Sequence, residues 1–114
     1  MSYVVYILYS DSTNVFYKGQ TSDMNARLMR HNNGLEKSTK SGSPWILIWV
    51  TEKKSRSEAM GLERKLKNLS REKLIEFINK YNDGIAGPDA QVRMLTEASA
   101  FKSRHPPQIF LPDL

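Results

Sequence analysis

The stretch that decides the fold is Tyr3-Val4-Val5-Tyr6-Ile7-Leu8-Tyr9, followed after a short polar segment by Phe16-Tyr17-Lys18-Gly19. Seven consecutive apolar or aromatic residues, most of them β-branched or tyrosine, predict a strand that is buried on both faces. Residues 10–14, Ser-Asp-Ser-Thr-Asn, have the composition of a turn. Residues 15–20 then form the returning strand, so this part of the sequence predicts a β-hairpin.

The predicted hairpin brings two tyrosines to one face. If Tyr9 pairs with Asn14, Tyr6 lies directly opposite Tyr17, and cross-strand partners point to the same face. The placement depends on the register, because a shift by one residue would separate the two side chains. Gly19 leaves open space beyond Tyr17, where the backbone of a ligand can approach. For the hairpin taken alone, a plain pair of buried core tyrosines is the favoured interpretation.

Composition and charge limit the class of protein. The chain has 114 residues, no cysteine, and no apolar run long enough to span a membrane. Without a visible signal peptide, we expect a single cytoplasmic domain that lacks disulfides and thiolate metal sites. Residues 18–73 hold 13 of the 17 basic and 6 of the 12 acidic residues, a local balance of +7. Such a surface favours a phosphate-backbone partner, although solvated lysine-rich helices would give the same count.

A short helix is predicted after the hairpin and carries two polar candidates. Ser22 or Asp23 can cap its start, and Gly34 ends it. Arg27 and His31 are four positions apart, so they lie on one face of the helix. A guanidinium and an imidazole together can bind a phosphate and move a proton. Taken alone, two exposed polar residues are the favoured interpretation of this pair.

A loop and a third strand come next. Residues 35–44 are polar and rich in turn formers, which predicts a loop. Four of its side chains can contact phosphates, namely Lys37, Ser38, Thr39 and Lys40. Residues 45–50 are the second apolar run and predict the third strand. Its two tryptophans, Trp45 and Trp49, are expected to share a face and to pack in the core.

Two more helices are predicted after the third strand. Ser55 or Ser57 caps the first, and its apolar side chains recur at helical spacing, at Ala59, Leu62, Leu66 and Leu69. Ser70 caps the second, whose apolar side consists of Leu74, Ile75, Phe77 and Ile78. Glu63 lies at the margin of the first apolar stripe. Taken alone, it is an ordinary surface glutamate paired with Arg64 or Lys67.

The character of the sequence changes at residue 82. Residues 82–88, Asn-Asp-Gly-Ile-Ala-Gly-Pro, are a cluster of residues that break regular structure. Residues 105–112 contain three prolines and show no hydrophobic period. We therefore expect a domain of residues 1–81 followed by a loosely attached or disordered tail of residues 82–114.

Taken in order, the candidate residues resemble the GIY-YIG nuclease superfamily. The matching motifs are Val4-Val5-Tyr6, Tyr17-Lys18-Gly19, Arg27 and His31 on one helix, and Glu63 on a later helix. The resemblance covers about residues 3–80. It is closest to the small, single-domain branch related to the excinuclease nuclease module. Val4 stands where the family pattern has glycine, and Lys18 where it has isoleucine, but both tyrosines and Gly19 remain.

The resemblance implies an α+β fold in which a small three-stranded antiparallel sheet is flanked by helices, in the order β-β-α-β-α-α. It also implies phosphodiester hydrolysis with Mg²⁺ or Mn²⁺. Tyr6 or Tyr17 is then the general base, and the sequence leaves open which. His31 would act as a relay or partner of the base, and Arg27 would stabilise charge on the phosphate. Glu63 would supply the one carboxylate for the metal ion.

We therefore expect a metal-dependent endonuclease that acts on DNA, with RNA left open, and with low or structure-directed specificity. Its setting would be DNA repair or recombination. The expected contacts to nucleic acid are Lys18, Gly19, Lys37, Thr39, Lys40, Arg64 and Lys67. The alternative is a non-catalytic nucleic-acid-binding module on the same fold. An interaction protein that uses Pro106 and Pro107 has little support, and the oligomeric state is not predicted.

Overall fold

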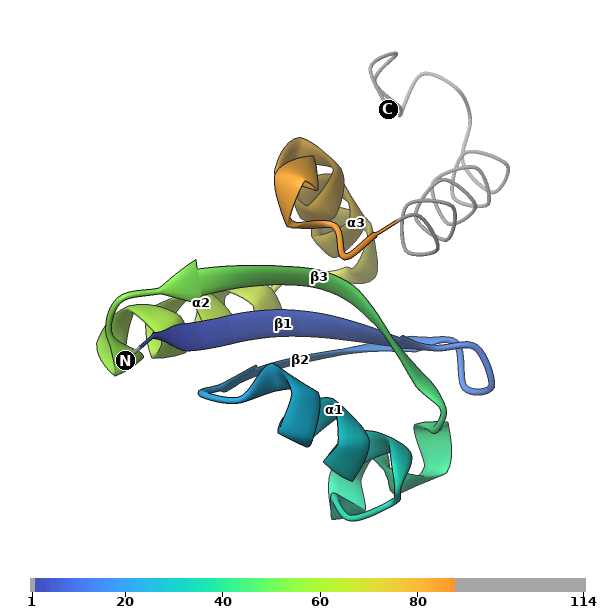
Figure 1. Ribbon diagram of the computed structural model, residues 1–114. Helices are drawn as coiled ribbons and strands as arrows, with labels where there is room; N and C mark the ends of the chain where they lie inside the picture. Colours follow the sequence, from blue (N-terminus) through green and yellow to red (C-terminus); the bar gives the residue numbers. More distant parts are fainter. Residues whose placement is uncertain (1, 88–114) are drawn as a thin grey trace, which may run out of the picture.

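The computed structural model describes residues 2–87, which form one three-stranded sheet with helices on both faces (Figure 1). The elements are β1 (Tyr3–Ser10), β2 (Val15–Thr21), α1 (Met24–Asn32), the 3₁₀ helix η1 (Lys37–Gly42), β3 (Trp45–Lys53), α2 (Arg56–Lys67), α3 (Arg71–Lys80) and the 3₁₀ helix η2 (Asn82–Gly84). The strands are antiparallel in the order β2-β1-β3. The predicted α+β fold and order β-β-α-β-α-α are confirmed, with two 3₁₀ helices added.

The central position of β1 explains its uninterrupted apolar sequence. Alternate side chains of this strand enter two different cores, so neither face of the strand can be polar. The core beneath α2 and α3 contains Val5, Ile7, Tyr9, Ile48, Trp49, Ala59, Leu66, Leu74, Ile75 and Ile78. The core beneath α1 contains Tyr6, Leu8 and Trp45, with Met24 and Leu28 of α1 packed against it. Burial of each large apolar side chain contributes about 1.5–3 kcal/mol.

The register of the hairpin differs from the predicted one by two positions. Tyr6 pairs with Gly19, and Leu8 pairs with Tyr17. The expected direct pairing of Tyr6 with Tyr17 is therefore wrong. The cause is the turn, where Asn14 adopts φ +58° within the loop and is not part of the returning strand. Asparagine tolerates this left-handed conformation well. Because the shift is an even number, both tyrosines still point to the same face, as diagonal neighbours.

A β-bulge in β3 sends the two tryptophans to opposite faces of the sheet. The pairing of β3 with β1 skips one residue at Ile48, and an extra residue reverses the alternation of side chains beyond it. Trp45 therefore joins the core beneath α1, and Trp49 joins the core beneath α2 and α3. The expected burial of both side chains is confirmed, with exposed fractions of 6% and 3%. The expectation that they share a face is wrong.

The helices begin and end where their capping residues predict. The side chains of Asp23, Ser55 and Ser70 each accept a hydrogen bond from a backbone N–H in the first turn of α1, α2 and α3. Gly34 follows the end of α1 with φ +73°, a conformation that glycine adopts without strain. The predicted loop after α1 is more regular than expected, since η1 occupies most of it and buries Thr39 and Gly42.

The first residues of the predicted tail contact the sheet. The indole N–H of Trp49 donates to the backbone carbonyl of Tyr81 at 2.8 Å, and the N–H of Ala86 donates to the carbonyl of Ile48 at 2.8 Å. Ile85 forms a bridge to Trp49 and packs against the larger core. Residues 82–86 are thus attached, although the sequence predicted the tail to begin at residue 82. Residues 88–114 of the predicted tail lie outside the described residues.

Among the described residues, no helix is both long enough and apolar enough to cross a membrane.

Candidate functional site

Three aromatic rings gather on the face of the sheet that α1 covers. Tyr6 comes from β1, Tyr17 from β2 and His31 from α1. The ring centroids of Tyr6 and Tyr17 lie 6.3 Å apart, and that of His31 lies 5.9 Å from Tyr6 and 5.0 Å from Tyr17. The two predicted tyrosines and the predicted histidine therefore form one cluster, although 25 residues of chain separate Tyr6 from His31.

A chain of hydrogen bonds runs through this cluster. The Tyr6 hydroxyl lies 2.9 Å from Nε2 of His31, and Nδ1 of His31 lies 2.7 Å from Oγ1 of Thr39. The Thr39 hydroxyl donates to the backbone carbonyl of Glu36 at 3.4 Å. In the tautomer with the ring proton on Nδ1, the Thr39 oxygen accepts this N–H. Nε2 then carries a lone pair, and the Tyr6 hydroxyl donates to it.

The polar groups of this chain lie away from solvent. The exposed fractions of Tyr6, His31 and Thr39 are 0%, 1% and 1%. Burial raises the pKa of the Tyr6 hydroxyl, and Tyr17 raises it further, while the Arg27 guanidinium lowers it. Burial also lowers the pKa of His31 below its usual 6.5, with the positive charge of Arg27 adding to this effect. The imidazole is thus neutral at neutral pH, as its role as hydrogen-bond acceptor requires.

Two charged residues act on the Tyr6 hydroxyl from outside the ring cluster. The positive charge of Arg27 and the negative charge of Glu63 both influence the Tyr6 pKa. Glu63 is 19% exposed and forms an ion pair with Lys67 at 2.9 Å. This is the pairing that the sequence left open as the ordinary interpretation of Glu63. The carboxylate therefore has a neighbouring ammonium that a bound cation would have to displace.

Glu63 lines a hollow of about 290 Å³ along α2, together with Met60, Arg64, Lys67 and Asn68. No group of three or more His, Cys, Asp or Glu side chains within residues 2–87 is arranged to hold a metal ion. A single hard carboxylate fits Mg²⁺ only as a sparse site, in which water and substrate phosphate supply the other ligands. The donor set is compatible with Mg²⁺ in that form.

The model of the GIY-YIG catalytic domain family matches residues 2–82 of the chain. This chain belongs to the GIY-YIG family. The two tyrosines of the name pattern are Tyr6 and Tyr17, the side chains that meet on one face of the sheet.

The relatives of this GIY-YIG domain include small proteins called UPF0213. The UPF0213 protein of Staphylococcus haemolyticus is 35% identical over 68 residues, which cover 59% of this chain and 83% of the relative. That of Staphylococcus aureus strain Mu50 is 34% identical over 80 residues, which cover 69% and 96%. The solution NMR structure of the UPF0213 protein from Bacillus halodurans has 31% identity and a TM-score of 0.50, covering 81% of this chain and 94% of that chain.

Gly19 and Thr39, two residues expected to contact nucleic acid, have partners inside this GIY-YIG domain instead. A side chain on Gly19 would place its Cβ 2.6 Å from the Tyr6 hydroxyl oxygen, so the expected open space is filled by the Tyr6 ring. Thr39 is buried and bonded to His31, so it is not a surface contact for phosphate. Both expectations failed because the polar or small residue has a partner inside the domain, which its neighbours in sequence do not reveal.

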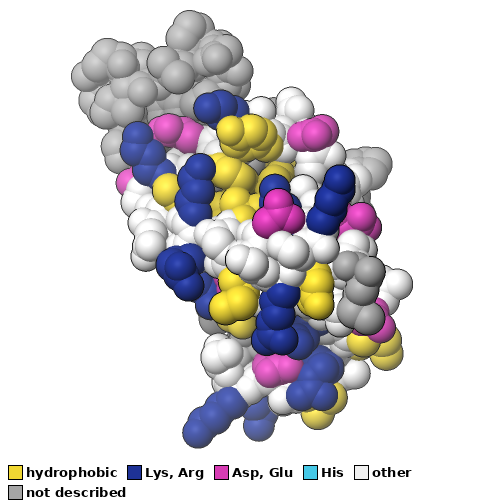
Figure 2. Space-filling model, turned by 90° about the vertical axis from the view of Figure 1, so that its left-hand side faces the viewer, with side chains coloured by type: hydrophobic (Ala, Val, Ile, Leu, Met, Phe, Trp, Pro, Cys, Tyr) yellow, Lys and Arg dark blue, Asp and Glu magenta, His cyan; other side chains and the backbone are white. Residues whose placement is uncertain are grey.

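The remaining basic candidates lie in separate places. Lys18 pairs with Ile7 and so points to the face opposite the two tyrosines, where burial and the charge of Lys67 lower its pKa. Lys37 and Lys40 are exposed on η1. Figure 2 shows Lys and Arg side chains gathered at the lower end of the molecule, the end where Figure 1 places α1. Arg64 is exposed, and with Lys67 it lines the hollow of Glu63.

The supporting roles of two residues were missed by sequence reasoning. Asn32, at the end of α1, donates to the backbone carbonyl of Trp45 at 3.2 Å and accepts the N–H of the same residue. The Trp45 indole N–H donates to the backbone carbonyl of Thr39 at 2.8 Å. These bonds fix η1 against the end of α1 and hold the Thr39 hydroxyl at His31. No spacing rule shows such contacts, since they join a helix end, a 3₁₀ helix and a strand.

Proposed function

We propose that this GIY-YIG domain is a divalent-metal-dependent endonuclease that hydrolyses phosphodiester bonds in DNA. The observation that carries the proposal is the hydrogen bond between the Tyr6 hydroxyl and the neutral ring of His31. It gives one family tyrosine a proton acceptor within 2.9 Å. A cytoplasmic location and a place in repair or recombination belong to the same proposal.

Tyr6 and His31 together act as the general base. A phenol has an ordinary pKa near 10 and does not lose its proton readily at neutral pH. In this domain burial raises the Tyr6 pKa further, so without a proton acceptor almost no Tyr6 would be ionised and able to act as a base. The Tyr6 hydroxyl is closed to solvent in the free domain, so this step requires the bound substrate to bring the attacking water to it. Tyr6 then takes a proton from that water, and its own proton passes to Nε2 of His31. Thr39 accepts the other ring N–H of His31, so the ring is already oriented to receive that proton.

Tyr17 and Arg27 face the substrate. Tyr17 is only partly buried, unlike Tyr6, so it is the first of the two tyrosines that a substrate meets. Arg27 lies on α1 and acts on Tyr6 through its charge. A guanidinium at this place stabilises the negative charge that grows on the phosphate as the water attacks. Glu63 would hold Mg²⁺ or Mn²⁺, which supplies further positive charge to the phosphate when bound.

Basic side chains on η1 and α2 would contact the phosphate backbone without reading bases. Lys37 and Lys40 extend from η1, and Arg64 and Lys67 extend from α2. Phosphate contacts position a nucleic acid and carry no sequence information. Low or structure-directed specificity is therefore part of the proposal.

The second candidate function is a nucleic-acid-binding module without catalysis. The ion pair between Glu63 and Lys67 favours it, because an engaged carboxylate leaves the metal without a ready ligand. The discriminating experiment incubates the full chain with nicked, flapped, single-stranded and plain duplex DNA, with and without Mg²⁺. A nuclease cleaves at least one substrate with Mg²⁺ and stops when the metal is chelated. A binding module retains all substrates uncut under both conditions while still shifting them in a gel.

A further inference from the structure

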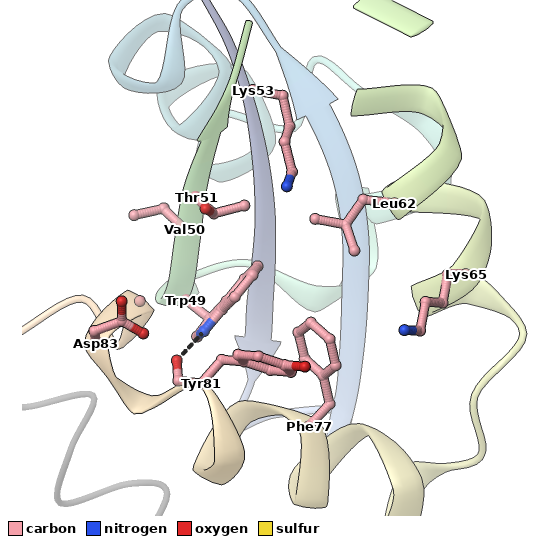
Figure 3. A pocket seen from close by; sticks show the side chains of 10 residues that line it. Trp49, Val50, Thr51, Lys53, Leu62, Lys65, Phe77, Tyr81 and Asp83 are labelled. Carbon is pink, nitrogen blue, oxygen red and sulfur yellow. Dashed lines mark hydrogen bonds between the residues drawn. The ribbon is translucent and has the colours of Figure 1, made fainter. Parts of the chain in front are cut away.

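A second hollow, of about 400 Å³, lies at the edge of the sheet formed by β3, under α2 and α3 (Figure 3). Its lining includes Trp49 and Lys53 of β3, Leu62 and Lys65 of α2, and Phe77 of α3. This volume is in the usual range for sites that bind small molecules. The hollow contains none of the residues assigned to catalysis, which are Tyr6, Tyr17, Arg27, His31 and Glu63.

Aromatic side chains form a fixed wall of this hollow. The ring centroids of Trp49 and Phe77 lie 5.2 Å apart, and those of Phe77 and Tyr81 lie 4.8 Å apart. The Trp49 indole N–H donates to the Tyr81 carbonyl at 2.8 Å, so its one polar atom is already satisfied. Tyr81 is 43% exposed, which leaves a large part of its side chain open to solvent. Such a surface can stack on the flat ring of a ligand.

Two ammonium groups approach the same hollow without a carboxylate to neutralise them. Figure 3 shows Lys53 pointing down into the hollow and Lys65 pointing in from α2. Nζ of Lys65 lies 5.9 Å from the centroid of the Phe77 ring. Neither lysine has an ion-pair partner within residues 2–87. Asp83 lies at the opposite end of the hollow from Lys65. The lining thus offers positive charge from two sides and a hydrogen-bond acceptor opposite Lys65.

We propose that this hollow binds a nucleotide. The base would stack against Phe77 and Tyr81, the phosphate would be attracted by the positive charges of Lys53 and Lys65, and an amino group of the base would donate to Asp83. A flat ring joined to a doubly charged phosphate satisfies all three features of the lining. The inference goes beyond the proposed nuclease activity and does not depend on it. A free nucleotide and an unpaired nucleotide of a strand share this chemistry, and two probes separate these sources.

The test titrates the full chain with adenosine 5′-monophosphate and, separately, with a short single-stranded oligodeoxyadenylate. NMR follows the indole N–H signals of Trp49 and Trp45. We expect the mononucleotide to shift the Trp49 signal and to leave the Trp45 signal, on the other face, in place. A shift with the oligonucleotide alone supports the strand as the source. The proposal is overturned if neither probe shifts the Trp49 signal at millimolar concentration.

Charge variants and partial ligands complete the test. Replacing both lysines, as Lys53→Gln with Lys65→Gln, should weaken binding by about tenfold or more, because charged hydrogen bonds to phosphate are lost. Lys73→Gln is the matched control, since this exposed α3 lysine lies outside the hollow. Inorganic phosphate and adenosine should each bind about tenfold more weakly than the nucleotide. A nucleotide site would be contradicted if the double variant bound the nucleotide as tightly as the parent does. It would also be contradicted if the parent bound inorganic phosphate as tightly as the nucleotide.

Discussion

The hydroxyl oxygen of Tyr6 lies 2.9 Å from Nε2 of His31, inside a domain where neither side chain is exposed by more than 1%. The bond joins the central strand to the first helix and orients both side chains. With the ring proton on Nδ1, Thr39 accepts it and the Tyr6 hydroxyl donates to Nε2. A tyrosine that donates to a neutral histidine can pass its proton on to it.

Thr39 should act as a positioning residue for His31. Thr39→Val keeps the shape of the side chain and removes the hydroxyl, which leaves Nδ1 of His31 without an acceptor. We expect the rate of cleavage to fall by roughly 10- to 100-fold, by analogy with the scale found when the hydrogen-bond partner of a metal-bound histidine is removed. The ¹⁵N signals of the His31 ring should show loss of the Nδ1–H tautomer.

Thr39→Ser is the control for that change, because it keeps the hydroxyl and removes only a methyl group. It should restore the tautomer and most of the rate. If Thr39→Val retained both the parent tautomer and the parent rate, Thr39 would have no positioning role. The ring signals can be read even in a protein that does not cleave, so this test is independent of nuclease activity.

Glu63→Gln should separate metal binding from stability. It keeps the size of the side chain and removes its charge, so cleavage should fall at least about 100-fold, since a metal ion contributes several kcal/mol to charge stabilisation. The lost ion pair with Lys67 is of the i,i+4 type and partly exposed, so the free energy of unfolding should change by less than about 0.5 kcal/mol. Glu76→Gln on α3 is the control. Unchanged Mg²⁺ dependence in Glu63→Gln would remove Glu63 from the metal site.

Gly19→Ala should damage both fold and activity, because the new Cβ would lie 2.6 Å from the Tyr6 hydroxyl oxygen and 2.7 Å from its Cζ. Displacing this buried ring should cost about 1–3 kcal/mol of unfolding free energy, measured in urea. Gly61→Ala is a matched control on α2, where a Cβ meets nothing within 4 Å. That control should be stabilised by about 0.4–1 kcal/mol. Equal stability and rate in Gly19→Ala and the parent would show that Tyr6 needs no room there.

The pH dependence of the cleavage rate should follow the fraction of His31 that is neutral. Burial holds its folded pKa below 6.5, with Glu36 opposing this effect and Arg27 and Arg30 adding to it. Cleavage should therefore be constant at neutral pH and fall only below about pH 6.5. The contribution of His31 to the free energy of unfolding should also decrease as the pH falls. It is fully present above the unfolded pKa and is lost as the pH falls through the folded pKa. A rate that rises on acidification would contradict a neutral His31.

Much of the fold is encoded in patterns that a single sequence displays. The uninterrupted apolar run of β1 indicates a central strand, because only a strand covered on both faces lacks polar positions. The capping residues Asp23, Ser55 and Ser70 begin helices where expected. The alternation of side chains along the hairpin predicts Tyr6 and Tyr17 on one face. This prediction holds although the register is different, because the difference is an even number of residues.

Other features depend on contacts that local patterns do not contain. The faces of Trp45 and Trp49 were predicted from simple alternation, and one extra residue at Ile48 reverses it. Thr39 lies in a polar stretch that resembles a surface loop, yet its hydroxyl is buried because His31 offers it a partner. A polar segment is correctly predicted to be exposed only if none of its side chains serves as the hydrogen-bond partner of a buried polar group.

The central claim is that Tyr6 with His31 removes a proton from the attacking water, and the single-turnover cleavage rate of Tyr6→Phe tests it most directly. The variant removes one hydroxyl and leaves Nε2 of buried His31 without its partner, so the free energy of unfolding should fall by about 1–3 kcal/mol. The affinity for DNA should be almost unchanged. The rate should fall by about 10²- to 10⁴-fold, the usual scale for a lost acid–base group. Tyr3→Phe, at the start of the same strand, should cleave like the parent. If Tyr6→Phe cleaved DNA at the parent rate in the presence of Mg²⁺, the assigned base would be wrong.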